Sequence, residues 1–184
     1  YSQEWQIEAA RRGLPVYPDS LSAAAVWQMP ETIDLFGRFH IFSELECHSR
    51  YEIMLENYRK IALIEARTLL EMVQRQVTPA VIACAGKSAA QLAHLRSVGL
   101  DNAALYRYTQ RLSKAVSDLF AGVEKLRDDL HALPAEVSEE SNRMLRDTIR
   151  VDMEALRDIS DGVEQVVNAA DWPMPTYTDL MHRV

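Results

Sequence analysis

The sequence predicts an all-α protein: a bundle of three long helices, with short helices before it and an extended Trp-Pro tail after it. Seven prolines leave the stretches 31–78, 80–133 and 135–172 free of proline, and only six of 184 residues are glycine. Such tracts suit long helices and disfavour an all-β fold with frequent turns. With 48% apolar and 26% charged residues, the chain has the composition of an ordinary globular protein.

A short helix is expected over residues 3–12. Ser2 can cap its first turn through the side-chain oxygen, and Gly13 stands where a left-handed residue ends a helix.

A second short apolar helix is expected over residues 20–28. Asp19 or Ser20 can start it, and Pro30 ends it; residues 31–36 add a further turn or two.

The first long helix begins with a capping box, in which Ser43 and Glu46 each satisfy the other's backbone amide. From 44 to 77 it would span about 50 Å. Pro79 lacks an N–H and is expected to kink the helix, which resumes to about Arg96. Its apolar side chains recur mainly at steps of three and four, at Tyr51, Met54, Tyr58, Ile61, Glu65/Ala66, Leu69, Met72 and Val77.

The second long helix is expected over residues 102–132, with Asp101 as its cap and Pro134 beyond its end. Steps alternating between four and three residues predict a heptad seam. This seam comprises Leu112, Val116, Leu119, Val123, Leu126, Leu130 and Leu133.

The third long helix is expected from about Ser138 to Asn168, antiparallel to the second because the connection is short. Its apolar seam is interrupted by Asp152, at a position where the heptad spacing predicts an apolar residue. The other seam positions are Leu145, Ile149, Leu156, Ile159, Val163, Val166 and Ala170.

The tail, residues 172–184, starts with the extended Trp172-Pro173-Met174-Pro175 and adds one helical turn over 176–181. We expect Trp172 and Tyr177 to dock it on the bundle or on a missing core. The chain would thus have three parts: residues 1–42, the bundle 43–171 and the tail.

Charge and cysteine content exclude several classes of protein. The net charge of −7 argues against nucleic-acid binding, which needs a basic surface. No apolar run reaches the 18 residues of a membrane span, and no signal peptide opens the chain. Cys47 and Cys84 form no disulfide framework, so a reducing cytoplasm is expected. Because Tyr1 enters helix-like sequence at once, the chain is predicted to be a fragment of a longer protein.

Gly86-Lys87-Ser88 matches part of a phosphate-binding loop. That motif also needs a glycine where Val81 stands, and a strand before the loop. The pattern here is helical, so phosphate binding is not expected.

Carboxylates on a long-helix bundle raise the possibility of a di-iron site, which needs two Glu-x-x-His motifs. Neither is present. Glu44 and His48 are four residues apart, Asp128 and His131 form one Asp-x-x-His, and Glu52 with Glu56 is typical of a solvated face.

Cys47 and His48 are adjacent and point about 100° apart on a helix, so one is expected inside and one at the edge. His40, His94 and His182 have no partner spacing, and Trp5, Trp27 and Trp172 are expected to be packing anchors. We therefore expect no catalytic, cofactor-binding or metal-binding residue in this chain.

Three blocks of the sequence resemble the type III glutamine synthetases. The blocks are Tyr1-Ser-Gln-Glu-Trp5 with Glu8-Ala-Ala-Arg-Arg-Gly-Leu14; Leu35-Phe36 with Phe42-Ser43-Glu44-Leu45, His48-Ser-Arg-Tyr-Glu-Ile53, Leu55-Glu-Asn-Tyr58, Ile64-Glu-Ala66 and Pro79-Ala80; and Trp172-Pro-Met-Pro-Thr-Tyr177 with Asp179-Leu180. The middle block is the most specific, whereas 85–140 matches mainly in helical character.

The resemblance implies a parent enzyme that makes glutamine from glutamate, ammonia and ATP, with Mg or Mn as cofactor. It places the nucleotide and metal ligands in a preceding catalytic domain, and no motif of theirs matches a residue here. The implied role of this region is packing on that core and on neighbouring subunits in stacked hexameric rings. The alternative is an independent helical interaction module without an enzyme; what lies upstream of Tyr1 distinguishes the two.

Overall fold

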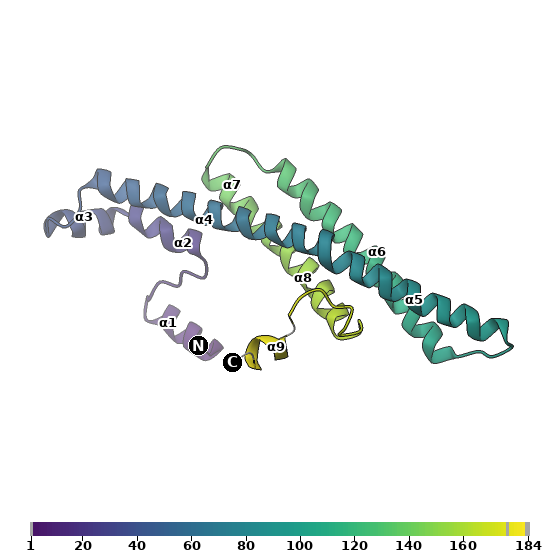
Figure 1. The fold of residues 1–184 in the computed structure, drawn as a ribbon. Coiled ribbons are helices and arrows are strands. Elements are labelled where there is room, and N and C mark those ends of the chain that lie inside the picture. The colour runs from purple at the N-terminus through teal and green to yellow at the C-terminus, as the bar shows by residue number, and fades with distance from the viewer. Residues whose placement is uncertain (1, 176, 183–184) are drawn as a thin grey trace. The chain divides into compact units, whose positions relative to one another are not determined.

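The computed structural model describes residues 2–175 and 177–182, and every regular element in them is a helix (Figure 1). Three long helical stretches are present, as predicted. In chain order the elements are α1 (Gln3–Arg11), α2 (Ser20–Ala25), the 3-10 turn η1 (Val26–Gln28), α3 (Pro30–Arg38), α4 (Glu44–Met72), the π-helical η2 (Val73–Val77), α5 (Thr78–Ser97), α6 (Ala103–Ala132), α7 (Glu139–Met144), the π-helical η3 (Leu145–Ile149), α8 (Arg150–Glu164) and α9 (Tyr177–His182).

By its contacts the chain divides into two compact units. The first unit contains the residues up to Ile61 together with Pro134–Arg143. The second contains Ala62–Leu133 and the residues from Met144 onward.

The helix boundaries in the first unit largely follow the predicted caps. Ser2 accepts a hydrogen bond from the Trp5 amide, Gly13 has a φ of +70°, and Asp19 caps α2. In the capping box, the Ser43 amide donates to Glu46 Oε2 at 2.7 Å. Pro30, expected only to end a helix, is instead the first residue of α3, where its missing N–H costs nothing.

The core of the first unit lies between α2 and α4. Leu21 and Ala24 pack with Tyr51 and Leu55, and Trp27 covers their edge. Two polar contacts then fasten the 134–143 segment to α4. A buried Arg59 donates to the Pro134 carbonyl, and the amide nitrogen of Asn142 lies 3.5 Å from the Leu55 carbonyl.

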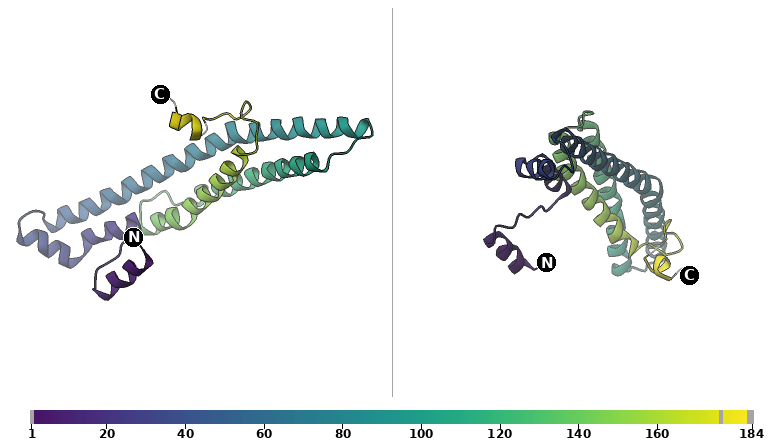
Figure 2. Two further views of the ribbon diagram at one scale, coloured as in Figure 1. Left: turned by 90° about the horizontal axis from the view of Figure 1, so that it is seen from below. Right: turned by 90° about the vertical axis from the view of Figure 1, so that its left-hand side faces the viewer.

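The passage from α4 to α5 runs through Pro79 without a break in helicity, so of the predicted kink or break only a kink remains. A π turn precedes the proline, and the Thr78 amide bonds the Val73 carbonyl five residues back. Such turns are among the few causes of helix kinks. In Figure 2 the axis changes direction where α4 passes into α5.

The second unit packs α6 against both α5 and α8. Tyr108 bonds Val166, while Lys125 bonds Asp152, so α6 and the third long helix are antiparallel, as predicted. A Cβ on Gly122 would lie 3.0 Å from Leu156 Cδ1, so glycine permits the close approach of α6 and α8.

The predicted seams are correct in their main members and wrong in phase at their ends. Leu112, Leu119 and Leu126 of α6 are fully buried. Ala115 replaces Val116 as a buried residue, and Leu130 and Leu133 are only half-buried.

The third helix differs from prediction in two ways. It ends at Glu164 instead of Asn168. Ser160 and Val167 are buried, whereas Ile159 and Val166 are half-buried and Ala170 is exposed. A straight α-helix drifts from a seven-residue repeat, so the buried line moves to the neighbouring residue.

The cap of α6 also differs from the prediction. Asn102 accepts the Leu105 amide at 2.9 Å, whereas Asp101 accepts the amide of Asn102. Both side chains can cap a helix, but Asn102 stands directly before Ala103 and has the extended backbone of an N-cap residue.

Candidate functional site

The residues that match part of a phosphate-binding loop lie inside α5. Lys87 Nζ contacts Asp171 Oδ1 at 2.7 Å, and the buried Ser88 hydroxyl lies 2.7 Å from Thr109 Oγ1. Lys87 therefore anchors the segment before the tail, and Ser88 joins α5 to α6. Backbone amides inside a helix bond their own carbonyls and cannot cradle a phosphate.

The candidate metal ligands stand apart. Glu44 and His48 face each other at 3.7 Å on an exposed surface, and Asp128 and His131 are both exposed. Among residues 2–175 and 177–182, no three His, Cys, Asp or Glu side chains come close enough to share an ion. That the chain binds no metal stays a prediction.

Both cysteines are free thiols that serve packing. Cys47 is fully buried and His48 is half-buried, as the 100° rule predicted. Cys84 Sγ lies 3.4 Å from the Tyr108 hydroxyl, which donates to the Val166 carbonyl at 2.8 Å. The contact with Cys84 and burial raise the pKa of Tyr108 to about 12, so this hydroxyl stays protonated as a link between α5, α6 and the turn that follows α8.

A charged cluster between α6 and α8 is the main feature that sequence reasoning did not assign. Lys125 bonds Asp129 at 3.0 Å and also reaches Asp152, which is only 7% exposed. Burial raises the pKa of Asp152. Hydrogen bonds from Asp152 and Lys125 lower the pKa of Asp129, and both carboxylates raise the pKa of Lys125. The sequence signal for the cluster was Asp152 at a seam position.

The tail docks on the second unit, as predicted for Trp172. This side chain is 8% exposed, and its indole nitrogen has no hydrogen-bond partner among the described residues. The Tyr177 side chain lies outside the described residues. Beside Trp172 is a cavity of about 450 Å³, which is lined by Met72, Gln76, Asp161, Glu164, Trp172–Pro175 and Leu180.

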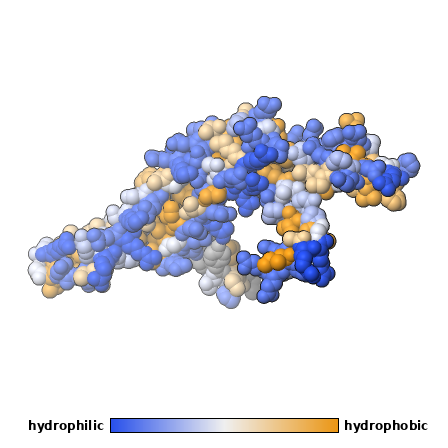
Figure 3. Space-filling view, turned by 180° about the vertical axis from the view of Figure 1, so that it is seen from behind, coloured by the Kyte–Doolittle hydropathy of each residue, from blue (hydrophilic) through white to orange (hydrophobic). Residues whose placement is uncertain are grey.

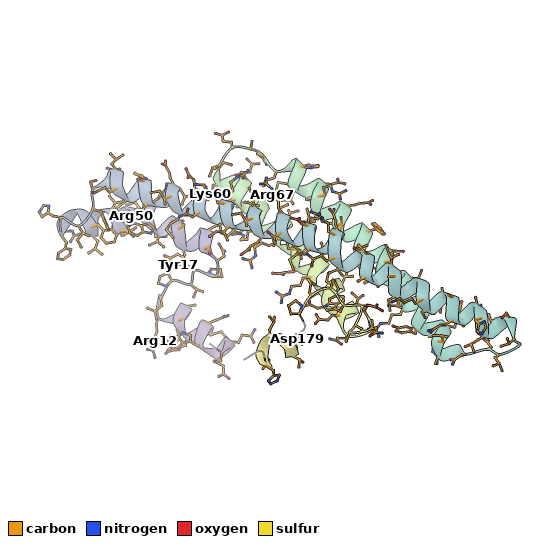
Figure 4. All side chains as sticks on the ribbon, viewed as in Figure 1. Arg12, Tyr17, Arg50, Lys60, Arg67 and Asp179 are labelled. Carbon is orange, nitrogen blue, oxygen red and sulfur yellow. The ribbon has the colours of Figure 1, made fainter. Side chains whose placement is uncertain are left out.

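Trp27 is the second packing anchor, at the corner between α3 and α4. Its ring stacks on Phe36 at 5.4 Å, and Phe42 packs edge-on against both. Arg50, labelled on α4 in Figure 4, places its guanidinium 4.1 Å from the Phe42 centroid. Trp5 does not fit this expectation, because it is 50% exposed.

Large apolar side chains remain exposed in both units. Figure 3 shows such apolar surface between hydrophilic residues on the face opposite to that of Figure 1. Surface of this kind is typical of a domain that packs on other protein. The most exposed in the first unit are Ile7, Val16, Phe39, Leu45 and Ile61.

None of the helices in the described part of the chain combines the length and the apolar character needed to cross a bilayer. The polar contacts of Ser88, Tyr108 and Lys125 join packed segments of the chain to one another. The fold and these contacts together are those of an all-helical structural domain.

Comparison with known proteins identifies the family of this domain. The model of the glutamine synthetase C-terminal domain matches residues 1–96. The chain is 32% identical to a glutamine synthetase of Butyrivibrio fibrisolvens, 28% to a type-3 glutamine synthetase of Dictyostelium discoideum and 27% to a glutamine synthetase of Bacteroides fragilis strain YCH46. Each alignment covers 98% of this chain and 26% of the relative, so the chain spans about a quarter of their length. The chain belongs to the glutamine synthetase C-terminal domain family, as the resemblance predicted.

Proposed function

We propose that this chain is the non-catalytic helical region of a type III glutamine synthetase, whose longer parent forms glutamine from glutamate, ammonia and ATP. The observation that carries this proposal is the alignment of nearly the whole chain with a quarter of each relative. ATP and Mg or Mn would bind in the remaining part of the parent, which is cytoplasmic in this proposal.

The contacts support a structural role. Phosphoryl transfer needs metal-held phosphates and cationic groups around the transferred phosphate. Here Lys87 is paired with Asp171, and Lys125 with two aspartates. These cations stabilise helix packing. The exposed apolar residues of the first unit provide surface for the catalytic part and neighbouring subunits.

The chain alone tests the absence of catalysis. It should form no glutamine from glutamate, ammonia and ATP, and calorimetry with ATP and magnesium should show no saturable heat. A micromolar nucleotide site would contradict the proposal.

The longer parent tests the structural role. Its truncation before this region should yield smaller assemblies in light scattering, and glutamine formation should fall as a consequence. A truncated parent that assembles fully but has lost turnover would place catalytic groups in this region. An open reading frame that starts at or near Tyr1 would favour an independent interaction module.

A further inference from the structure

The outer side of the α5–α6 hairpin is apolar although it faces solvent. Ile82 is 45% exposed, Phe120 is 50% exposed and Tyr106 is 41% exposed. Lys87 and Arg96 are the charged residues of α5, and Lys87 is paired with Asp171. A solvent-facing helix normally carries charged residues along that side, so this surface is unusual for water contact.

A groove of about 370 Å³ lies between α5 and α6, and of these three side chains Ile82 lines it. Ile82, Gly86 and Ala89 line it from α5, and Ser113, Val116 and Ser117 line it from α6. Phe120 lies one turn beyond Val116 on the same side of α6. We use the name hairpin face for the exposed side chains and the groove lining together: Ile82, Gly86, Ala89, Tyr106, Ser113, Val116 and Phe120. The hairpin face thus contains exposed side chains, such as Phe120, and a groove into which the side chains of a partner could fit.

Charge limits where two copies of this chain can meet. The whole chain has a net charge of −7, so two copies repel each other over most of their surface. The hairpin face itself carries no formal charge. Arg96 lies at one end of it, 5.3 Å from the Tyr106 ring and 3.7 Å from Asp101 Oδ1, and Glu124 lies one turn beyond Phe120 at the other end.

The two charged ends are arranged for antiparallel pairing. Ser113 lies midway between Tyr106 and Phe120, seven residues or about 10.5 Å from each. A two-fold axis near Ser113 brings the Arg96 end of one copy to the Glu124 end of the other. A parallel arrangement would bring like charges together.

We propose that the hairpin face binds the same face of a second copy of this chain, antiparallel and centred near Ser113. A surface that is self-complementary in this way suits a closed two-fold contact. The inference deepens the proposed assembly role and rests on it for the biological setting. A face about 21 Å long and two helices wide covers roughly 400 Å² per copy, so the contact is weak in isolation.

Thiol cross-linking of the isolated chain tests the contact. Ser113→Cys adds an exposed thiol at the centre of the face, while Cys47 and Cys84 are buried. A short bis-maleimide should link Ser113→Cys into dimers with at least about tenfold higher yield than the control Ser49→Cys, because the dimer raises the local thiol concentration. Equal yields would overturn the proposal.

Gly86→Glu tests whether the hairpin face causes the dimer. A Cβ at Gly86 meets nothing within 4 Å, so the variant should fold. Two glutamates near the axis should abolish cross-linking of Ser113→Cys. Gly37 also lies in a helix with open space around it, so Gly37→Glu is the matched control and should retain the dimer. Undiminished cross-linking in Gly86→Glu would overturn the proposal.

A charge swap tests the antiparallel register. Arg96→Glu should lower the cross-linking yield, and Glu124→Arg in the same chain should restore it. If Arg96→Glu lowered the yield by unfolding the chain, a second substitution at Glu124 would not restore cross-linking. No rescue would overturn the antiparallel arrangement. Failure of these experiments would not overturn the proposed function. That proposal is tested by glutamine formation and by assembly of the longer parent.

Discussion

At the scale of single residues, Asp152 illustrates how a buried charge is kept in a helical seam. Its neighbours along the seam, Ile149 and Leu156, are fully buried and apolar. Lys125 compensates the carboxylate while its own ammonium stays partly in water. Burial of a carboxylate disfavours its ionised form, and the lysine opposes that effect. The net result is a raised pKa for Asp152.

This raised pKa gives Asp152→Asn a stability effect that depends on pH. When the folded pKa lies above the unfolded value, the folded protein binds the proton more tightly. The contribution of Asp152 to the stability of the folded protein therefore falls as pH rises through the window just above 3.8. Asparagine does not titrate, so the stability of Asp152→Asn relative to wild type should increase with pH across that window.

Urea unfolding between pH 3 and pH 7 measures this difference. The control is Asp128→Asn, an exposed position beside Asp129 on the same helix. Asp128→Asn removes one negative charge from the same helix and leaves the contacts of Lys125 with Asp129 and Asp152 in place. A difference between Asp152→Asn and wild type that stays constant over the whole range would show that Asp152 does not titrate differently in the folded state.

At the scale of the helix, α6 shows where a heptad pattern stops describing burial. Leu126 and Leu130 occupy successive seam positions in the sequence. The structure buries Leu126 completely and Leu130 only in part. Leu130 lies in the last turn of α6, two residues before its end at Ala132, where a regular spacing alone does not ensure burial.

The two leucines should therefore differ in their contribution to stability. Leu126→Ala removes a fully buried side chain and should lower the free energy of unfolding by roughly 2–5 kcal/mol. Leu130→Ala, the same change one turn later, should cost clearly less. Denaturant midpoints of both variants measure this. If Leu126→Ala left the midpoint unchanged, Leu126 would have to face solvent.

At the scale of the whole chain, the segment after α8 depends on contacts distant in sequence. Asp171 pairs with Lys87 of α5, and Trp172 is buried in the second unit beside Met72 and Gln76. Prolines on both sides of Met174 restrict the backbone, so docking orders few additional dihedral angles.

Trp172 should be the residue that keeps the tail docked. Trp172→Ala should increase the rate of proteolytic cleavage within residues 172–182 by more than about tenfold, because the lost burial exceeds about 1.4 kcal/mol. Trp5→Ala changes an exposed tryptophan and should leave this cleavage rate as in wild type. Slow cleavage of Trp172→Ala would mean that Lys87 and Asp171 hold the tail without the indole.

Local sequence determined most helix boundaries and the all-α class. The capping box of Ser43 and Glu46, the left-handed Gly13 and Gly99 and the long proline-free tracts act within a few residues, so their effect can be read from spacing. The family could likewise be predicted, because the resemblance lies in the residues themselves. The tertiary structure decided which seam residues are buried, that Lys125 pairs with Asp152, and that an apolar groove remains open between α5 and α6. These features depend on which helices meet and at which register, and burial and charge pairing between distant residues follow only from that packing.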